Sequence, residues 1–191
     1  MTERGITPSQ TVGPFFSFAL TPGANYANVG IAGEDLVTGD TVGEPILVVG
    51  RILDGEGTVV TDAMIEIWQA DGAGHYSGNG TAANTTFKGF GRSETSEGGF
   101  RFRTVKPGRV AGPDGKTQAP HINVSLFARG ILRRMFTRIY FEGEPGNDDD
   151  PVLRLVPADR RSTLIARRDE TARFVFDIKL QGEDETVFFE A

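Results

Sequence analysis

The clearest structural signal is the segment Gly99-Phe-Arg-Phe-Arg-Thr-Val105, in which aromatic and charged residues alternate. A period of two places Phe100 and Phe102 on one face of a strand and the arginines on the other. Near the other end of the sequence, Arg173-Phe-Val-Phe-Asp-Ile-Lys-Leu180 repeats the pattern. Both segments therefore predict β-strands with one face in a core and one face in water.

Short apolar runs of similar length occur along the rest of the chain. They are Pro45–Leu53, Ala63–Trp68, His121–Phe127, Thr137–Phe141 and Glu185–Glu190. The 25 glycines and 10 prolines are spread over the sequence and do not gather in one linker. Many short strands with dispersed turn residues are typical of an all-β fold. We therefore expect a mainly β protein.

Two regions depart from this pattern. Residues 157–168 begin with proline and end in two arginines, which predicts one short helix, since proline suits the first helical turn and cations suit the last. Residues 1–44 contain phenylalanines but little periodicity, and we expect them to form an irregular arm that packs on the domain or on a partner subunit. The domain itself is expected over residues 45–191.

Composition narrows the functional classes. A length of 191 residues fits one domain, and the absence of cysteine favours a reducing compartment over a disulfide-stapled secreted scaffold. The net charge of -6 disfavours nucleic acid as a partner. No run of apolar residues is long enough to span a membrane, and Met1–Gln10 lacks the features of a secretory signal. The acidic run Asp148–Asp150 predicts a surface turn.

Alternation also assigns side chains within Ala63–Trp68. Trp68 is expected in the core, because aromatic residues dominate β-sandwich interiors. Glu66 lies between two isoleucines and should face away from them as a solvated carboxylate.

Six short strings occur in a characteristic order. They are Leu53–Gly57, Ile65–Asp71, Gly89–Arg92, Phe102–Gly108, Ala119–Phe127 and Ile139–Gly143. Together they resemble the intradiol ring-cleavage dioxygenases, non-haem enzymes that use Fe(III) and O2 to open a catechol ring. The resemblance implies an antiparallel β-sandwich core.

The two ends of the chain narrow the resemblance. Thr7–Phe15, Phe127–Gly130 and Gln181–Phe189 are similar to the alpha-type chains of the two-chain family members that act on protocatechuate. This implies a hetero-oligomer with a homologous beta chain, residence in the bacterial cytoplasm, and cleavage of protocatechuate to 3-carboxy-cis,cis-muconate in the beta-ketoadipate pathway of aromatic catabolism.

The family's metal ligands are only partly present. Its iron is held by two tyrosines and by two histidines spaced as His-x-His, and the matching positions here are Tyr76, Val110, His121 and Asn123. An amide is a poor ligand for ferric iron and valine has no ligand atom, while Gln118 matches an arginine of the active chains. The resemblance therefore implies a vestigial site, with no metal ligand in this chain and Fe(III) bound by the beta subunit.

The resemblance also implies that this chain lends residues to the partner's substrate pocket. The matching positions are Thr11, Gly13, Pro14, Phe15 and Arg129, with no catalytic residue among them. A guanidinium near the pocket suits a substrate that carries a carboxylate.

Plainer readings of the same residues remain open. Thr11–Pro14 is then a turn that fixes the arm, Arg129 a surface ion-pair partner, His121 a buried hydrogen-bonded histidine and Tyr76 a packed tyrosine. For the whole chain the alternatives are a non-catalytic β-sandwich binding module, or a single-chain dioxygenase with altered ligands. The latter is disfavoured because the chain has only 2 histidines and 3 tyrosines.

Overall fold

The computed structural model describes residues 10, 11, 13, 19–21, 32–78, 87–112, 115–171 and 173–190. Strands dominate these residues, and no helix among them is long and apolar enough to cross a membrane. The strands are β1 (Pro45–Gly50), β2 (Ile52–Leu53), β3 (Ala63–Trp68), β4 (Phe90–Glu94), β5 (Phe100–Val105), β6 (Val110–Ala111), β7 (Thr117–Gln118), β8 (His121–Ala128), β9 (Met135–Phe141), β10 (Ile165–Arg168), β11 (Phe174–Val175) and β12 (Ile178–Lys179). The 3-10 helices are η1 (Pro145–Asp149), η2 (Leu153–Leu155) and η3 (Arg161–Leu164).

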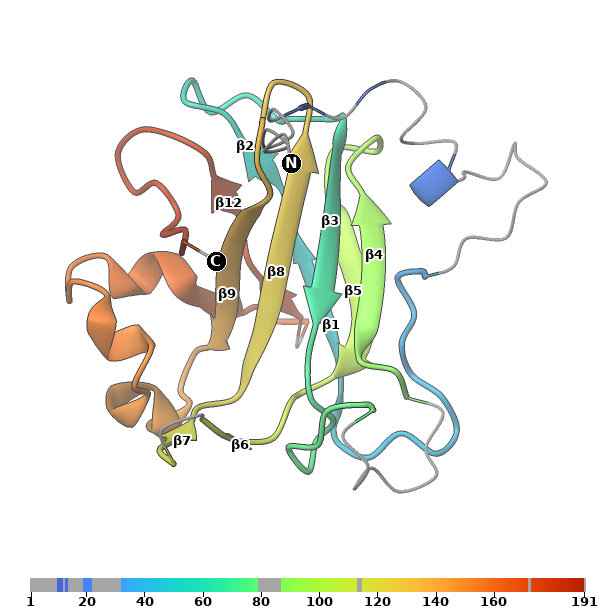
Figure 1. Ribbon diagram of the computed structural model, residues 1–191, viewed down its shortest axis with the longest axis vertical. Helices are drawn as coiled ribbons and strands as arrows, with labels where there is room; N and C mark the ends of the chain where they lie inside the picture. The colour runs from blue at the N-terminus through green and yellow to red at the C-terminus, as the bar shows by residue number, and fades with distance from the viewer. Residues whose placement is uncertain are drawn as a thin grey trace, which may run out of the picture.

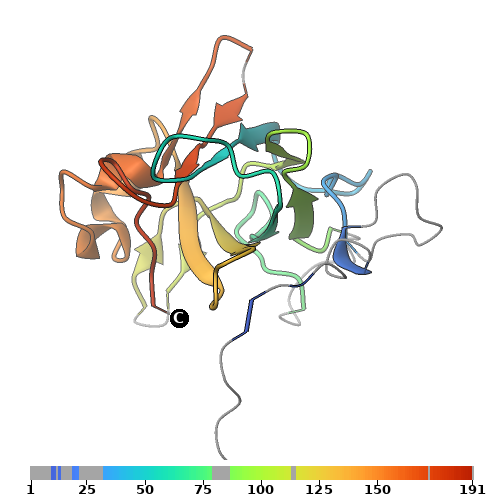
Figure 2. The ribbon, with the colours of Figure 1, turned by 90° about the horizontal axis from the view of Figure 1, so that it is seen from above.

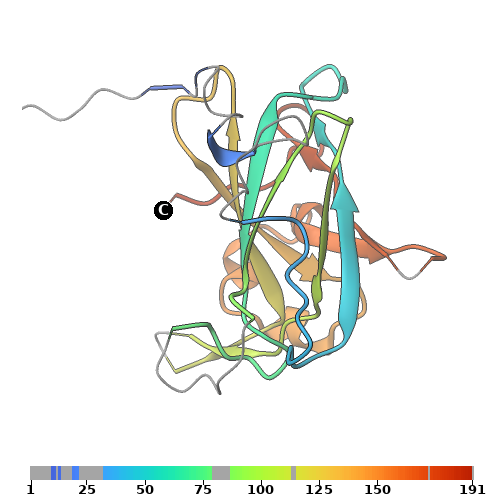
Figure 3. The same ribbon diagram turned by 90° about the vertical axis from the view of Figure 1, so that its right-hand side faces the viewer.

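The predicted mainly β fold is confirmed. One continuous eight-stranded sheet has the order β4-β3-β8-β9-β10-β11-β1-β5. It folds over itself, so that β9, β8, β3 and β4 form a front layer with β1 and β5 behind them (Figure 1), and Figure 3 shows the two layers from the side. Strand β10 connects the layers, since it pairs in parallel with β9 and antiparallel with β11. The connection between β10 and β11 projects from the body of the sandwich (Figure 2).

The core lies between the two layers. Phe102 of β5 is fully buried there with Ile65 of β3 and Val124 of β8, as the alternating pattern predicts. Phe141 of β9 meets Phe174 of β11 edge to face, with ring centroids 4.9 Å apart. Burying each large apolar side chain stabilises the fold by about 2 kcal/mol, so this layer of side chains holds the sheets together.

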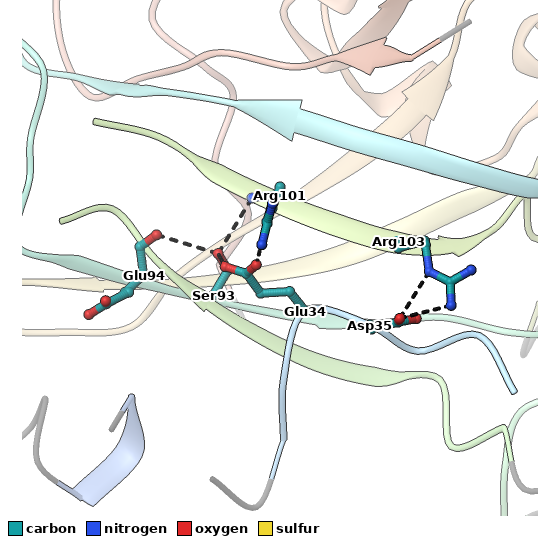
Figure 4. Close-up of polar contacts among 6 residues, drawn as sticks. All are labelled: Glu34, Asp35, Ser93, Glu94, Arg101 and Arg103. Carbon is teal, nitrogen blue, oxygen red and sulfur yellow. Dashed lines mark hydrogen bonds and ion pairs between the residues drawn. The ribbon is translucent and has the colours of Figure 1, made fainter. Parts of the chain in front are cut away.

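Residues 33–36 run along the open edge between β4 and β5. The backbone of Arg103 donates to Glu34 and accepts from Leu36, which adds this segment to β5. Figure 4 shows the accompanying ion pairs of Glu34 with Arg101 and of Asp35 with Arg103, and the hydrogen bond that the hydroxyl of Ser93 donates to Glu34. The segment therefore covers backbone groups that a free edge strand would expose.

The helix predicted over 157–168 is wrong for most of its length. Only Arg161–Leu164 is helical, as η3, and Ile165–Arg168 continues as β10. Pairing with β9 and β11 satisfies the backbone of β10, and Ala166 is fully buried, so tertiary contacts override the local helix signals. The predicted strand Glu185–Glu190 is reduced to a single bridge between Phe136 and Phe189.

Two side-chain predictions for β3 need correction. Trp68 is 39% exposed, because it is two residues from Glu66 and therefore lies on the same outward face of the strand. Glu66 faces away from the core as predicted, but it is not solvated. Its Oε1 accepts a hydrogen bond of 2.9 Å from Nε of Arg92, and both side chains are mostly buried.

The expected surface turn at Asp148–Asp150 also contains a buried residue. Asp148 and Asp149 are exposed, whereas Asp150 has no exposed surface. The carboxylate of Asp150 joins η1 and η2 to the sandwich through four hydrogen bonds. Their donors are the backbone N–H groups of Ala119 (2.8 Å), Val152 (2.9 Å) and Leu153 (2.7 Å) and the hydroxyl of Tyr140 (3.0 Å).

Replacing this carboxylate is expected to destabilise the fold strongly. Asp150→Ala leaves several buried donors without an acceptor and should lower the free energy of unfolding by about 3 kcal/mol. The exposed neighbour provides the control, since Asp148→Ala should change it by no more than about 0.5 kcal/mol. Urea denaturation of both variants measures the difference, and equal stabilities would contradict the role assigned to Asp150.

Candidate functional site

The residues that match the family's ligand positions gather on the outer face of the front layer. His121 and Asn123 are two residues apart on β8, so their side chains share one face. Strand register places His121 opposite Tyr140 of β9, and Asn123 between Trp68 of β3 and Arg138 of β9.

His121 is a buried, hydrogen-bonded histidine, as one of the two interpretations of this residue predicts. Its Nδ1 lies 2.8 Å from the carbonyl oxygen of Ala119 and its Nε2 lies 3.5 Å from the hydroxyl of Tyr76. A carbonyl only accepts, so Nδ1 carries the proton and Nε2 is the acceptor. Burial, with the positive charge of Arg138, lowers the pKa of His121 to about 4, so the ring is neutral at pH 7.

Tyr76 completes this part of the site. Its ring stacks on Trp68 with centroids 5.9 Å apart and an interplanar angle of 14°. Its hydroxyl donates to Nε2 of His121 and accepts a long hydrogen bond of 3.5 Å from the amide of Asn123. Burial raises the pKa of Tyr76, which keeps the phenol protonated.

Arg138 links the site to the buried carboxylate of Asp150. Its Nη1 donates to Oε1 of Gln118 at 2.7 Å and lies 3.4 Å from the hydroxyl of Tyr140. Tyr140 in turn donates to Asp150, and burial raises the pKa of Tyr140. Arg138, Tyr140 and Asp150 were not predicted from the sequence to be part of the site. A signal existed for Arg138 and Tyr140, which are polar residues at alternate positions of the otherwise apolar strand Thr137–Phe141.

Val110 borders the site from the β6–β7 hairpin. It pairs with Gln118 across the two strands and its aliphatic side chain is buried. At the position where the resemblance places a tyrosine, the chain therefore presents only methyl groups.

These residues do not fit a ferric ion. Of the four ligand positions, only Tyr76 and His121 have a side chain suited to Fe(III), and both are neutral and engaged with each other. The described residues also contain no cluster of three or more His, Cys, Asp or Glu side chains that could hold another metal. The guanidinium of Arg138 adds a fixed positive charge beside the same face.

Thr11 and Arg129, two of the residues predicted to serve a partner's pocket, lie at the other end of β8. The hydroxyl of Thr11 donates to the carbonyl oxygen of Ala128 at 3.4 Å and accepts from the backbone N–H of Gly130 at 3.0 Å. Arg129, between them, is 82% exposed and its Nε lies 3.0 Å from a carboxylate oxygen of Asp62. The structure thus brings Thr11 and Arg129 together. Gly13 is described and exposed, whereas Pro14 and Phe15 lie outside the described residues.

Comparison with known proteins identifies the family to which the chain belongs. The family model described as "Dioxygenase" matches residues 13–182, and the chain belongs to this family, the intradiol ring-cleavage dioxygenases. The chain is 44% identical over 200 residues to the protocatechuate 3,4-dioxygenase alpha chain of Burkholderia cepacia, with 100% of both chains covered. It is 44% identical over 193 residues to the alpha chain of the same name from Pseudomonas putida, with 96% of each covered.

The chain is also similar to a beta chain and to a solved dioxygenase domain. The protocatechuate 3,4-dioxygenase beta chain of Burkholderia cepacia is 37% identical over 162 residues, which cover 78% of this chain and 69% of that one. Among solved structures, the dioxygenase domain of a dioxygenase carbohydrate-binding protein fusion from Streptomyces sp. SirexAA-E superposes with a TM-score of 0.61 at 26% identity. That match covers 92% of this chain and 99% of the domain.

The lowered pKa of His121 predicts a pH-dependent stability. The unfolded chain takes up a proton near pH 6.5 and the folded chain only near pH 4, so the contribution of this ring is complete above pH 6.5 and is lost as the pH falls towards 4. Between pH 7 and pH 4.5, the natural chain should lose about 2–3 kcal/mol more than His121→Gln. Urea denaturation at both pH values measures this, with His75→Gln, at an exposed histidine, as the control. Parallel pH profiles for the natural chain and His121→Gln would contradict the assignment.

Proposed function

We propose that this chain is the alpha-type subunit of a protocatechuate 3,4-dioxygenase. The observation that carries the proposal is the 44% identity to an alpha chain of that name over the full length of both proteins. The enzyme is a heteromer of this chain with a homologous beta chain, and it cleaves protocatechuate with O2 to 3-carboxy-cis,cis-muconate in the bacterial cytoplasm. The assembly as a whole is the oxidoreductase, and this chain has no catalytic residue of its own.

Fe(III) belongs to the partner in this proposal. The absent tyrosine at Val110 and the absent histidine at Asn123 support a vestigial site formed by Tyr76, Val110, Gln118, His121 and Asn123. Bound by the beta chain, Fe(III) would supply the chemistry that activates a catecholate towards O2. The neutral, mutually bonded Tyr76 and His121 serve to stabilise the fold of this chain instead.

The alpha chain completes the substrate pocket of its partner. Arg129 binds or attracts the carboxylate of protocatechuate, while the turn at Thr11, Gly13 and Pro14, with Phe15 beside it, forms a rigid wall. The hydrogen bonds of Thr11 to Ala128 and Gly130 support this role, because they hold Thr11 next to the arginine. The exposed ion pair of Arg129 with Asp62 contributes little to stability, so the guanidinium is free to exchange it for a substrate carboxylate.

The N-terminal arm also has a packing role in this proposal. Residues 1–44 pack on the domain or on the partner, and residues 45–191 form the sandwich domain. Ion pairs of Glu34 and Asp35 with β5 anchor the last part of the arm on its own domain (Figure 4).

Co-expression tests the function itself. The chain is produced alone and together with a homologue that carries both tyrosines and the His-x-His pair, and iron content and protocatechuate-dependent oxygen uptake are measured. Iron and activity are expected only in the complex. Iron together with oxygen uptake in this chain alone would contradict the proposal, as would an inactive complex that contains iron.

The pocket role of Arg129 is tested in the assembled enzyme. Arg129→Ala should raise KM for protocatechuate several-fold, because the substrate carboxylate loses a charged hydrogen-bond partner. Arg133→Ala removes the same charge from an exposed position nearby and should leave KM unchanged. An unaltered kcat/KM in Arg129→Ala would remove the arginine from the pocket.

A further inference from the structure

Arg138 is a charged residue that the proposed function leaves without a role. It lies on β9 directly opposite Asn123, the position that lacks the second histidine of the family pattern. Its side chain shares the outer face of the sheet with that of Tyr140, two residues further along the strand. It therefore borders the same group of side chains that would surround a metal ion.

The guanidinium is bonded to neutral oxygen atoms. Nη1 donates to the amide oxygen of Gln118 at 2.7 Å and approaches the hydroxyl of Tyr140 at 3.4 Å. Its charge also acts on Tyr76 and on His121, on the far side of the site. The positive charge is thus held by an amide oxygen and a phenol oxygen, both of which are uncharged acceptors.

The charge of Arg138 is balanced only indirectly. Among the residues that the structure describes, no carboxylate lies within ion-pair distance of it, and its Nε is buried without an acceptor. The buried carboxylate of Asp150 meets Arg138 only through the hydroxyl of Tyr140. The guanidinium is therefore a partly buried cation whose direct hydrogen-bond acceptors are uncharged.

We propose that the guanidinium of Arg138 replaces the metal ion in this chain, as a built-in cation that organises the vestigial site and keeps ferric iron out of it. The resemblance places an arginine at the position of Gln118, and here the positive charge is carried by β9 and hydrogen-bonded to that glutamine instead. The site has thus exchanged a dissociable cation for a covalently attached one. Repulsion between like charges then opposes metal binding even where ligands are available.

The proposal has a specific consequence: restoring the ligands is not sufficient to restore the metal. The double variant Val110→Tyr/Asn123→His recreates two tyrosines and two histidines but retains Arg138, and it should gain no iron. Adding Arg138→Gln removes the competing charge and should raise the iron content towards one additional iron per chain. A visible absorption band from phenolate-to-iron charge transfer should accompany the added metal.

The experiment uses the full chain, produced with its partner, and counts iron in excess of the unmodified complex. The result therefore does not depend on how much iron the partner holds, and it is separate from the test of the proposed function. The control is Val110→Tyr/Asn123→His with Arg133→Gln, which removes an exposed charge and should gain no iron. The proposal is overturned if the double variant binds as much iron as the triple variant with Arg138→Gln, or if that triple variant gains none.

A second measurement decides the matter if the triple variants do not fold. In the natural sequence, Arg138→Lys keeps the charge and Arg138→Met removes it with little change of volume. The thermal midpoint of Arg138→Lys should stay close to that of the natural chain, and that of Arg138→Met should fall by several degrees. Equal losses in both variants would show that the positive charge is not what the site requires.

Discussion

The register between β8 and β9 is the constraint on which the rest of the site depends. It sets His121 opposite Tyr140 and Asn123 opposite Arg138, so two polar pairs lie side by side on one face of an otherwise apolar layer. A one-residue shift of β9 would turn Arg138 and Tyr140 towards the core and expose Ile139, and the same shift of β8 would turn His121 and Asn123 inward and expose Ile122. Both isoleucines are fully buried, so the hydrophobic core itself holds the polar groups in place.

The protonation states on this face follow from the burial of its titratable side chains. Burial keeps Tyr76 and Tyr140 protonated and His121 neutral, and each neutral group satisfies another through a hydrogen bond. The carboxylate of Asp150 is the exception, and it is held by four donors. In a chain that binds a metal, deprotonated phenolates would require the charge of the ion. Here neutral partners and one arginine fill the site, and its residues stabilise the fold.

The sequence predicted the strands with strong alternation and missed those that depend on tertiary pairing. Phe100–Val105 has a clear period of two, and its inward face, with Phe100 and Phe102, was assigned correctly. Strand β4 has little apolar content, and β10 has the signals of a helix, so both are defined by the strands beside them. The candidate site was predictable at Tyr76 and His121 from the resemblance. Arg138 and Asp150 were not, because their importance comes from burial beside residues distant in sequence.

The length of β8 has a consequence for how the protein can change over time. The strand spans eight residues from His121 to Ala128, so its two ends lie about 24 Å apart. Charge effects in physiological salt fade over about 8 Å. A charge lost or gained beside Arg129 therefore has little electrostatic effect on the face around Arg138. Mutations at the two ends are expected to have additive effects on stability. Substitutions around Arg129 can then accumulate without changing the charge balance around Arg138.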